Sequence, residues 1–233
     1  MEHRLEEINQ ELLKENRVIV LADFKYDFLD TKPIVVNPHY FGDIKITPKS
    51  NEQSKFIIVG EIARARRNFL FLIDSMKDII NSTKKDFKIS IVSKTPVKEI
   101  KKIIPQDLKN YFELCGALNY YELFKKMEEN DYFLPLLDNG INEHERYITI
   151  GTSGSFQLIY GFAKPCIIHT KFAGVHSFNN DNSFLYNTKE EFVDKMKQAI
   201  ELSGKDYKII QDNLVKLKNE IYNKSLNNLK NAL

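Results

Sequence analysis

The sequence ITIGTSGSFQLIYGFAKPCII, residues 148–168, decides the fold that we expect of this chain. It reads as a turn of small residues, a short apolar helix, a Lys-Pro stop and a buried strand. Ser153, Gly154 and Ser155 stand where the helix begins, and the free N–H groups there form, with the helix dipole, a natural seat for phosphate. Gly154 would let a ligand come close to the backbone, and Gln157 lies within reach of a ribose hydroxyl. An ordinary N-capped helix explains the same residues equally well.

Short apolar strands and amphipathic helices alternate around this stretch. We expect strands over 56–60, 87–92, 111–115, 131–135 and 166–168, and helices over 69–80, 97–104, 121–129 and 189–202. This alternation predicts an α/β fold with a doubly wound, Rossmann-like parallel sheet. Ligands of such sheets bind beyond the carboxyl ends of the strands, where Gly60, Gly116 and the turn at Gly151 all fall.

The rest of the chain divides into three parts, 1–50, 51–204 and 205–233. We expect the end of a helix over 5–13, short strands over 17–22 and 33–38, and a polar linker over 42–54. The last part is a long amphipathic helix, with apolar residues at 3-4-3-4 spacing from Tyr207 to Ile221. We favour a helix packed across its own domain over a coiled coil.

Composition excludes several classes of protein. A net charge of +2 with 28% charged residues argues against a dedicated nucleic-acid binder. Cys115 and Cys166 lie in apolar stretches and read as small buried hydrophobic residues of a reducing compartment. The first seven residues do not resemble a signal peptide, and no apolar run approaches the ~20 residues of a membrane span. We expect a soluble, cytoplasmic protein.

Three arginines, Arg64, Arg66 and Arg67, lie between the strand that ends at Gly60 and the next helix. Arginine forms bidentate bonds with phosphate oxygens. The alternative is a solvated helix start, but cations there oppose the helix dipole, so the position favours a phosphate ligand.

A second loop, Leu118, Asn119 and Tyr120, follows the strand that ends at Gly116. It can present backbone groups to a nucleobase, with Tyr120 available to stack. A hydrophobic staple at the first turn of a helix explains the loop as well.

The remaining candidates are weaker. Lys164 reads as a partner of the carboxyl end of its own helix, and His39 and His144 as structural histidines. No HExxH, Walker or GxSxG motif occurs, so we assign no catalytic residue, metal ligand or cofactor.

Taken in order, these blocks resemble the C-terminal domain of GT-B-fold glycosyltransferases of the retaining family 4 type. The resemblance covers about residues 55–202, and its blocks are Ile58-Val-Gly60 with Arg67-Asn68, Phe112-Glu-Leu-Cys-Gly116, Asp131 to Pro135, Ser153-Gly-Ser155 and Lys164-Pro-Cys-Ile167.

The resemblance implies that this domain binds a nucleotide-sugar donor. Arg67 would take the position of the diphosphate-binding lysine, and Arg64 or Arg66 that of its arginine partner. We expect the Arg67 side chain to be exposed, so that its replacement spares folding. The loop from Leu118 to Tyr120 would contact the base, and Gly60 and Gln157 would also belong to the nucleobase and ribose site. The family's two glutamates are absent, since Ser153 to Gln157 occupy that region. In this the chain resembles bacterial capsule and lipopolysaccharide transferases with a Ser-Gly-Ser-x-Gln-Leu variant.

The resemblance also implies the role of the other parts. Residues 1–50 look like the last helix and strand of an N-terminal Rossmann domain, plus the hinge. The expected partners are a nucleotide-sugar donor, a saccharide or lipid-linked acceptor, and a separate N-terminal half or a second copy of the chain. A peripheral position at the inner membrane face stays open. Two alternatives are a degenerate, non-catalytic binding or assembly module, and an unrelated doubly wound domain with a small phosphorylated ligand.

Overall fold

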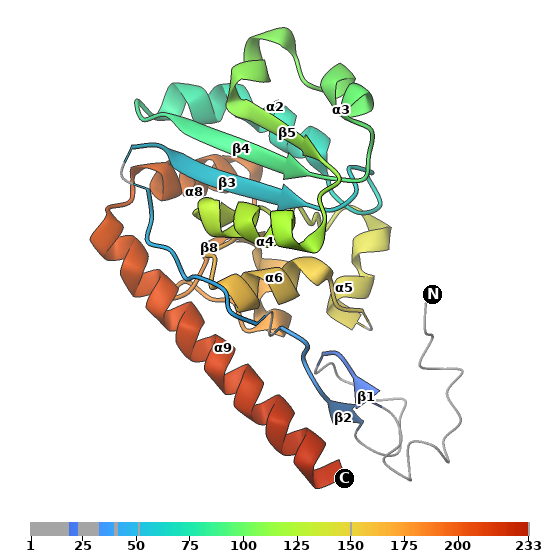
Figure 1. Ribbon diagram of the computed structural model, residues 1–233. Coiled ribbons are helices and arrows are strands. Elements are labelled where there is room, and N and C mark those ends of the chain that lie inside the picture. Colours follow the sequence, from blue (N-terminus) through green and yellow to red (C-terminus); the bar gives the residue numbers. More distant parts are fainter. Residues whose placement is uncertain (1–18, 23–32, 40–41, 51, 150, 233) are drawn as a thin grey trace.

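Parallel strands form the centre of the molecule (Figure 1), whose computed structural model describes residues 19–22, 33–39, 42–50, 52–149 and 151–232. The strands are β3 (Ser54–Val59), β4 (Phe87–Val92), β5 (Phe112–Gly116), β6 (Tyr132–Phe133), β7 (Ile167–His169) and β8 (Phe184–Tyr186). The order β5-β4-β3-β6 continues into β7-β8 through a parallel bridge between Phe133 and Cys166. The strand order therefore reverses between β3 and β6, which is the switch point where doubly wound sheets bind ligands.

Helices connect the strands and cover both faces of the sheet (Figure 1). The longer ones are α2 (Phe69–Ser82), α3 (Val97–Ile103), α4 (Tyr120–Glu129), α6 (Gly154–Phe162), α8 (Lys189–Glu201) and α9 (Gly204–Ala232). Short helical turns are η2 (Gln106–Tyr111), η3 (Asn142–His144), α5 (Arg146–Thr149), α7 (Thr170–Ala173) and η4 (Gly174–His176). A separate parallel pair, β1 (Ile19–Val20) and β2 (Ile34–Val35), precedes the main sheet.

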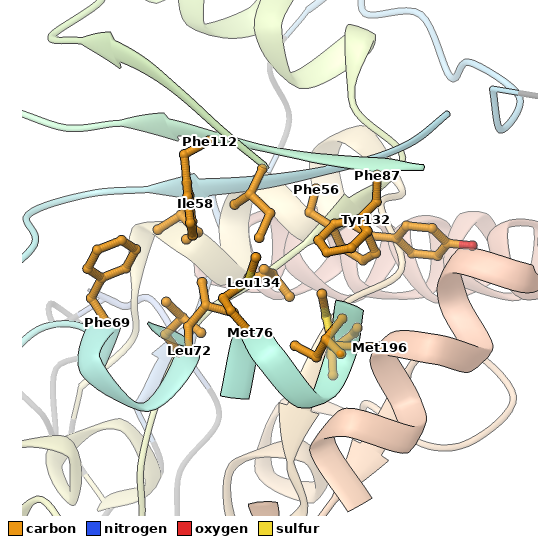
Figure 2. Packing of buried hydrophobic residues seen from close by; sticks show 14 of the residues in the cluster. Phe56, Ile58, Phe69, Leu72, Met76, Phe87, Phe112, Tyr132, Leu134 and Met196 are labelled. Carbon is orange, nitrogen blue, oxygen red and sulfur yellow. The ribbon is translucent and has the colours of Figure 1, made fainter. Parts of the chain in front are cut away.

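One face of the sheet packs against α2 and α8 (Figure 2). Alternate strand residues such as Phe56 and Ile58 point to this side, because side chains of a strand alternate between its two faces. Leu72 and Met76 of α2 and Met196 of α8 meet them, all fully buried. Burying a side chain of this kind stabilises a fold by about 1.5–3 kcal/mol.

The other face packs against α4, α6 and part of α9. Every residue of α6 from Ser155 to Phe162 is buried, which fits a helix that is apolar on nearly all sides. Since α6 leads from β6 back to the start of β7, its first residues lie at the carboxyl edge of the sheet.

The structure confirms the α/β fold, with a parallel sheet and a long C-terminal helix. Helix α9 packs across its own domain, where Tyr207 and Leu214 are fully buried. Strand β8 was not predicted, and β6 is shorter than the expected 131–135. The helix expected over 5–13 lies outside the described residues, and β1 and β2 fall within the strands expected over 17–22 and 33–38.

The segment expected as a polar linker lacks helix and strand from residue 42 to 50, but it is tightly fastened to the domain. The Lys49 ammonium donates to the carbonyls of Ala199, Ile200 and Leu202 at 2.7–3.1 Å, which closes the end of α8. The Thr47 hydroxyl donates to the carbonyl of Glu128 at 2.6 Å. We call residues 44–50 the strap.

The sequence prediction for Lys164 is wrong, because its ammonium group contacts the strap and α4 and not the carboxyl end of α6. Lys164 is fully buried, and its ammonium donates to Thr47 Oγ1 at 2.9 Å and to the carbonyl of Glu128 at 3.3 Å. It therefore holds the strap against the last turn of α4. Burial lowers the pKa of Lys164 to about 8.

Both cysteines are free thiols. Cys166 is fully buried, and burial raises the pKa of its thiol to about 12, whereas Cys115 is half-buried. Among the described helices, none is both long and apolar enough to span a bilayer.

Candidate functional site

Arg67 is the central residue of the candidate site, at the switch point between β3 and β6. Its side chain is only 6% exposed. Nη2 donates to the carbonyl of Val59 at 2.9 Å and to Ser155 Oγ at 2.5 Å, and Nη1 donates to the carbonyl of Arg66 at 2.6 Å. Two sequence-predicted residues from distant parts of the chain, Arg67 before α2 and Ser155 in the first turn of α6, are thus in direct contact.

The positive charge of Arg67 is buried, and no described residue provides a counter-ion for it. No carboxylate in the described part of the chain forms an ion pair with it, and its Nε is buried without a hydrogen-bond partner there. Burial lowers the pKa of Arg67, and the neighbouring Tyr147 opposes that shift. Because a guanidinium stays protonated in proteins, the site holds a cation that no described carboxylate neutralises.

Gly60 makes room for this guanidinium. Its φ is +125°, and a Cβ atom there would lie 2.9 Å from Arg67 Nη2. The sequence assigned Gly60 to nucleobase or ribose binding, whereas the structure places it against the predicted diphosphate residues. Only glycine combines this backbone angle with so close a neighbour.

The first turn of α6 faces this arginine. Ser153 is its N-cap and accepts a hydrogen bond from the Ser155 N–H at 3.3 Å. Gly154 is exposed, and a Cβ atom added there would meet nothing within 4 Å, so the space before the helix is open. Gln157 donates to Thr152 Oγ1 at 3.3 Å, and its Oε1 is buried with no partner among the described residues.

Arg64 and Arg66 do not join Arg67. Both side chains are exposed, and the turn that carries them is fixed by the Arg66 and Arg67 N–H groups, which donate to the carbonyl of Ala63 at 2.8 Å. The three arginines therefore divide into one buried and two exposed side chains, a division that their spacing did not predict.

The loop from Leu118 to Tyr120 lies at the same edge of the sheet. The Gly60 N–H donates to Val92 and the Ser93 N–H to Gly116, so the ends of β3 and β5 are separated by one strand, roughly 10 Å. Asn119 and Glu122 form a capping box at the start of α4. Leu118 is half-buried and Tyr120 is 80% exposed, available for stacking.

A third loop, which follows β6, is hydrogen-bonded to Asn68, the residue after Arg67. The sequence analysis did not assign this loop to the site. Asp138 accepts from the Asn68 side chain at 2.5 Å, and its N–H donates to His144 Nδ1 at 2.9 Å. His144 is fully buried, and burial together with the charge of Arg67 lowers its pKa, which keeps it neutral. Leu136, which precedes this loop, has a φ of +52°, a strained value for leucine.

Comparison with known proteins supports the fold; the chemistry must be argued from the residues of the candidate site. No family model and no curated protein matches the sequence. Among solved structures, a glycosyltransferase from Rickettsia africae matches with a TM-score of 0.67 and 16% identity, over 95% of this chain and 64% of the other. A variant of TarM from S. aureus, in complex with fondaparinux, α-GlcNAc-glycerol and UDP, matches with a TM-score of 0.61 and 16% identity, over 94% of this chain and 45% of the other.

A third structure shows that the match corresponds to a single domain. It is the C-terminal domain of LpcC, a glycosyl transferase group 1 family protein from Francisella tularensis, with a TM-score of 0.57 and 14% identity. The match covers 76% of this chain and 95% of that domain. The chain spans less than two thirds of the longer glycosyltransferases. Its fold is that of the C-terminal domain of GT-B glycosyltransferases.

Proposed function

We propose that this chain is the donor-binding domain of a glycosyltransferase. It would hold a nucleotide-diphosphate sugar for transfer of a hexosyl group to a saccharide or lipid-linked acceptor, in the synthesis of cell-surface polysaccharide at the cytoplasmic side. The proposal includes the family 4 type and its capsule and lipopolysaccharide variant, which rest on the sequence resemblance.

The observation that carries the proposal is the buried charge of Arg67 beside the first turn of α6, which has no ion-pair partner among the residues that the structure describes. A buried cation without a counter-ion costs several kcal/mol, and an anionic ligand removes that cost. A diphosphate between Arg67 and the α6 N-terminus would receive both charge and backbone donors. In a reaction, the same groups would stabilise the negative charge that develops on the leaving diphosphate.

Two structural neighbours contain ligands of this chemistry. The TarM variant was solved with UDP, and the pneumococcal O-GlcNAc transferase GtfA with UDP and GlcNAc. GtfA matches this chain with a TM-score of 0.58 and 14% identity. These ligands belong to those proteins, and they guide the choice of nucleotides to test here.

One observation favours a second candidate, a non-catalytic binding or assembly module. The first turn of α6 presents Ser153, Ser155 and Gln157 in place of the family's glutamates, and the Ser155 hydroxyl is already bonded to Arg67. A domain that had lost its donor would keep the fold and this internal bond.

Calorimetric titration with UDP, GDP and their sugars separates the two candidates. Donor binding predicts saturable heat with at least one of them, and a loss of that heat when Arg67 is replaced. No binding by any of them at millimolar concentration would exclude the donor site and favour the assembly module.

A further inference from the structure

A cavity of about 300 Å³ lies at the amino-terminal end of the sheet, on the face that α4 partly covers. Lys55 lines it at the start of β3, whereas Gly60 follows the end of that strand, roughly 17 Å away. The cavity is therefore separate from the arginine site. The described residues that line it are all polar or charged: Gln53, Lys55, Lys88, Ser90, Glu113, Lys126, Glu129 and Asn130.

Two lysines of this cavity face each other across neighbouring strands. Lys55 of β3 and Lys88 of β4 are register partners, and both point away from the core that Phe56 helps to form. Like charges directly opposite each other destabilise a sheet. The Lys88 ammonium donates to the carbonyl of Asn110 at 2.7 Å, and the Lys55 ammonium has no ion pair or hydrogen bond with any described residue.

The carboxylates of the cavity are committed to a third lysine. Glu113 lies 2.7 Å from the Lys126 ammonium and accepts from Ser90 Oγ at 2.7 Å, and Glu129 lies 3.5 Å from Lys126. Burial alone would raise the pKa of Glu113, but these bonds lower it, so the carboxylate stays ionised. Lys55 and Lys88 form no ion pair with any described carboxylate, although the Lys88 charge helps to lower the pKa of Glu113.

We propose that this cavity binds a small phosphate ester with a hydroxylated organic part, such as a sugar phosphate. The paired Lys55 and Lys88 ammonium groups supply the charge that a phosphate group needs. The volume lies at the lower end for ligand pockets and exceeds the space of a lone oxyanion. Glu113 and Glu129 keep lone pairs beyond their contacts with Lys126 and Ser90, and these can accept from hydroxyl groups. Every described side chain that lines the cavity is polar or charged.

Titration of the chain with glucose 6-phosphate, followed by calorimetry, tests this proposal. We expect saturable binding that weakens at least about tenfold in Lys55→Met and in Lys88→Met. Methionine keeps the apolar stem and removes the repulsion, so both variants should melt at or above the wild-type temperature. The exposed Lys77→Met is the matched control and should bind as wild type does. Arg67→Met should also bind it normally, because that residue serves the other edge of the sheet.

Inorganic phosphate should compete with the ester, and glucose should not bind measurably. The proposal is overturned if glucose 6-phosphate shows no saturable binding, or if glucose binds as tightly. It is also overturned if phosphate does not compete, or if Arg67→Met abolishes binding while the two lysine variants do not.

Discussion

The burial of Arg67 affects how a substitution at this residue must be interpreted. From the sequence, an exposed arginine was expected whose loss would spare the fold, and that expectation is wrong, since the side chain is 6% exposed. Replacement by alanine would leave a cavity beside β3 and mix the costs of packing and of lost binding. A long apolar side chain separates the two.

For Arg67→Met we expect nucleotide binding to weaken by about 1.5–3 kcal/mol, the contribution of a charge-assisted hydrogen bond. The free energy of unfolding should change by less than about 2 kcal/mol, because relief of the buried charge offsets the lost bonds to Val59 and Ser155. Calorimetry and urea denaturation measure the two quantities. Unchanged nucleotide affinity in a folded variant would remove Arg67 from the site.

The second prediction at the scale of one residue concerns the backbone conformation of Gly60. Gly60→Ala should destabilise the protein by about 1–3 kcal/mol, because alanine is strained at a φ of +125°. Gly174→Ala is the matched control, since a Cβ there meets nothing within 4 Å. A change within about 0.5 kcal/mol is expected for that control. If both variants melt alike, the backbone at Gly60 is not the constraint that we describe.

At the scale of the element, a substitution at Gly154 in the first turn of α6 should affect ligand binding without affecting folding. Gly154 is exposed, with open space around it, so Gly154→Ala should leave the melting temperature unchanged or raise it. If a diphosphate sits against the first turn, however, the added methyl group lies in its path. We expect nucleotide affinity to fall at least tenfold, measured by calorimetry beside a thermal melt. Full affinity in Gly154→Ala would place the ligand elsewhere.

Lys164, which is hydrogen-bonded to the strap, should make the stability of the protein depend on pH. The pKa of this lysine is about 8 in the folded protein, against 10.5 for an ordinary lysine, because burial disfavours its charge. Between these values the unfolded chain binds more protons, so this lysine makes stability rise with pH. Below pH 8 both states are protonated, and the full cost of the buried charge is present.

We therefore expect the wild type to gain about 2 kcal/mol relative to Lys164→Met between pH 8 and pH 10. Urea denaturation at a series of pH values measures this difference, and the comparison cancels groups that both proteins share. The exposed Lys77→Met should run parallel to wild type. A Lys164→Met curve that also runs parallel to wild type would contradict the assignment.

The sequence predicts the elements better than it predicts how they meet. The apolar runs of β3 and β4 and the 3-4-3-4 spacing of α9 each depend only on local pattern, and all three were found. The three-residue β8 is too short to leave such a pattern. The burial of Arg67 and Lys164 depends on the loop after β6 and on the strap, which close over them from distant parts of the chain. Charged residues are rarely buried, so no rule for single residues finds them.

The same limit holds at the scale of the candidate site. The sequence found Arg67 and Ser155 because glycines and small residues at the ends of strands are visible in it. It did not find Asp138, and it interpreted His144 as a structural histidine without placing it at the site; both side chains support the site from a loop with no recognisable motif. That loop lies at the switch point of the sheet, which exists only once β6 has paired with β3.

At the scale of the whole molecule, α9 ties the ends of the structure together. The helix has 29 residues, roughly 43 Å, and Tyr207 near its start lies in the core. Near its other end, Ser225 accepts from the Asn37 N–H at 3.0 Å and Asn228 donates to the carbonyl of Val35 at 2.9 Å. The segment around β2 is therefore held at the far end of a helix that is anchored in the main domain.

This arrangement supports a prediction about activity. On the proposed function, the purified chain should bind a nucleotide but transfer sugar poorly, because its fold matches only one domain of the longer glycosyltransferases. Transfer needs both substrates held in near-attack geometry, and loss of that positioning costs up to ~7–11 kcal/mol. A donor open to water would also lose stabilisation of its leaving diphosphate.

Acceptor-dependent turnover of the chain alone, measured beside its mass in solution, tests this. Ile19 in β1 and Leu21 directly after it are about half exposed, at 51% and 49%, so self-association is expected in the absence of a partner surface. Supplying the N-terminal half of one of the matched glycosyltransferases as a fusion should raise turnover without changing nucleotide affinity. Rapid transfer by a monomer of the chain alone would mean that the acceptor is held by this domain itself, and that the donor edge carries the whole reaction.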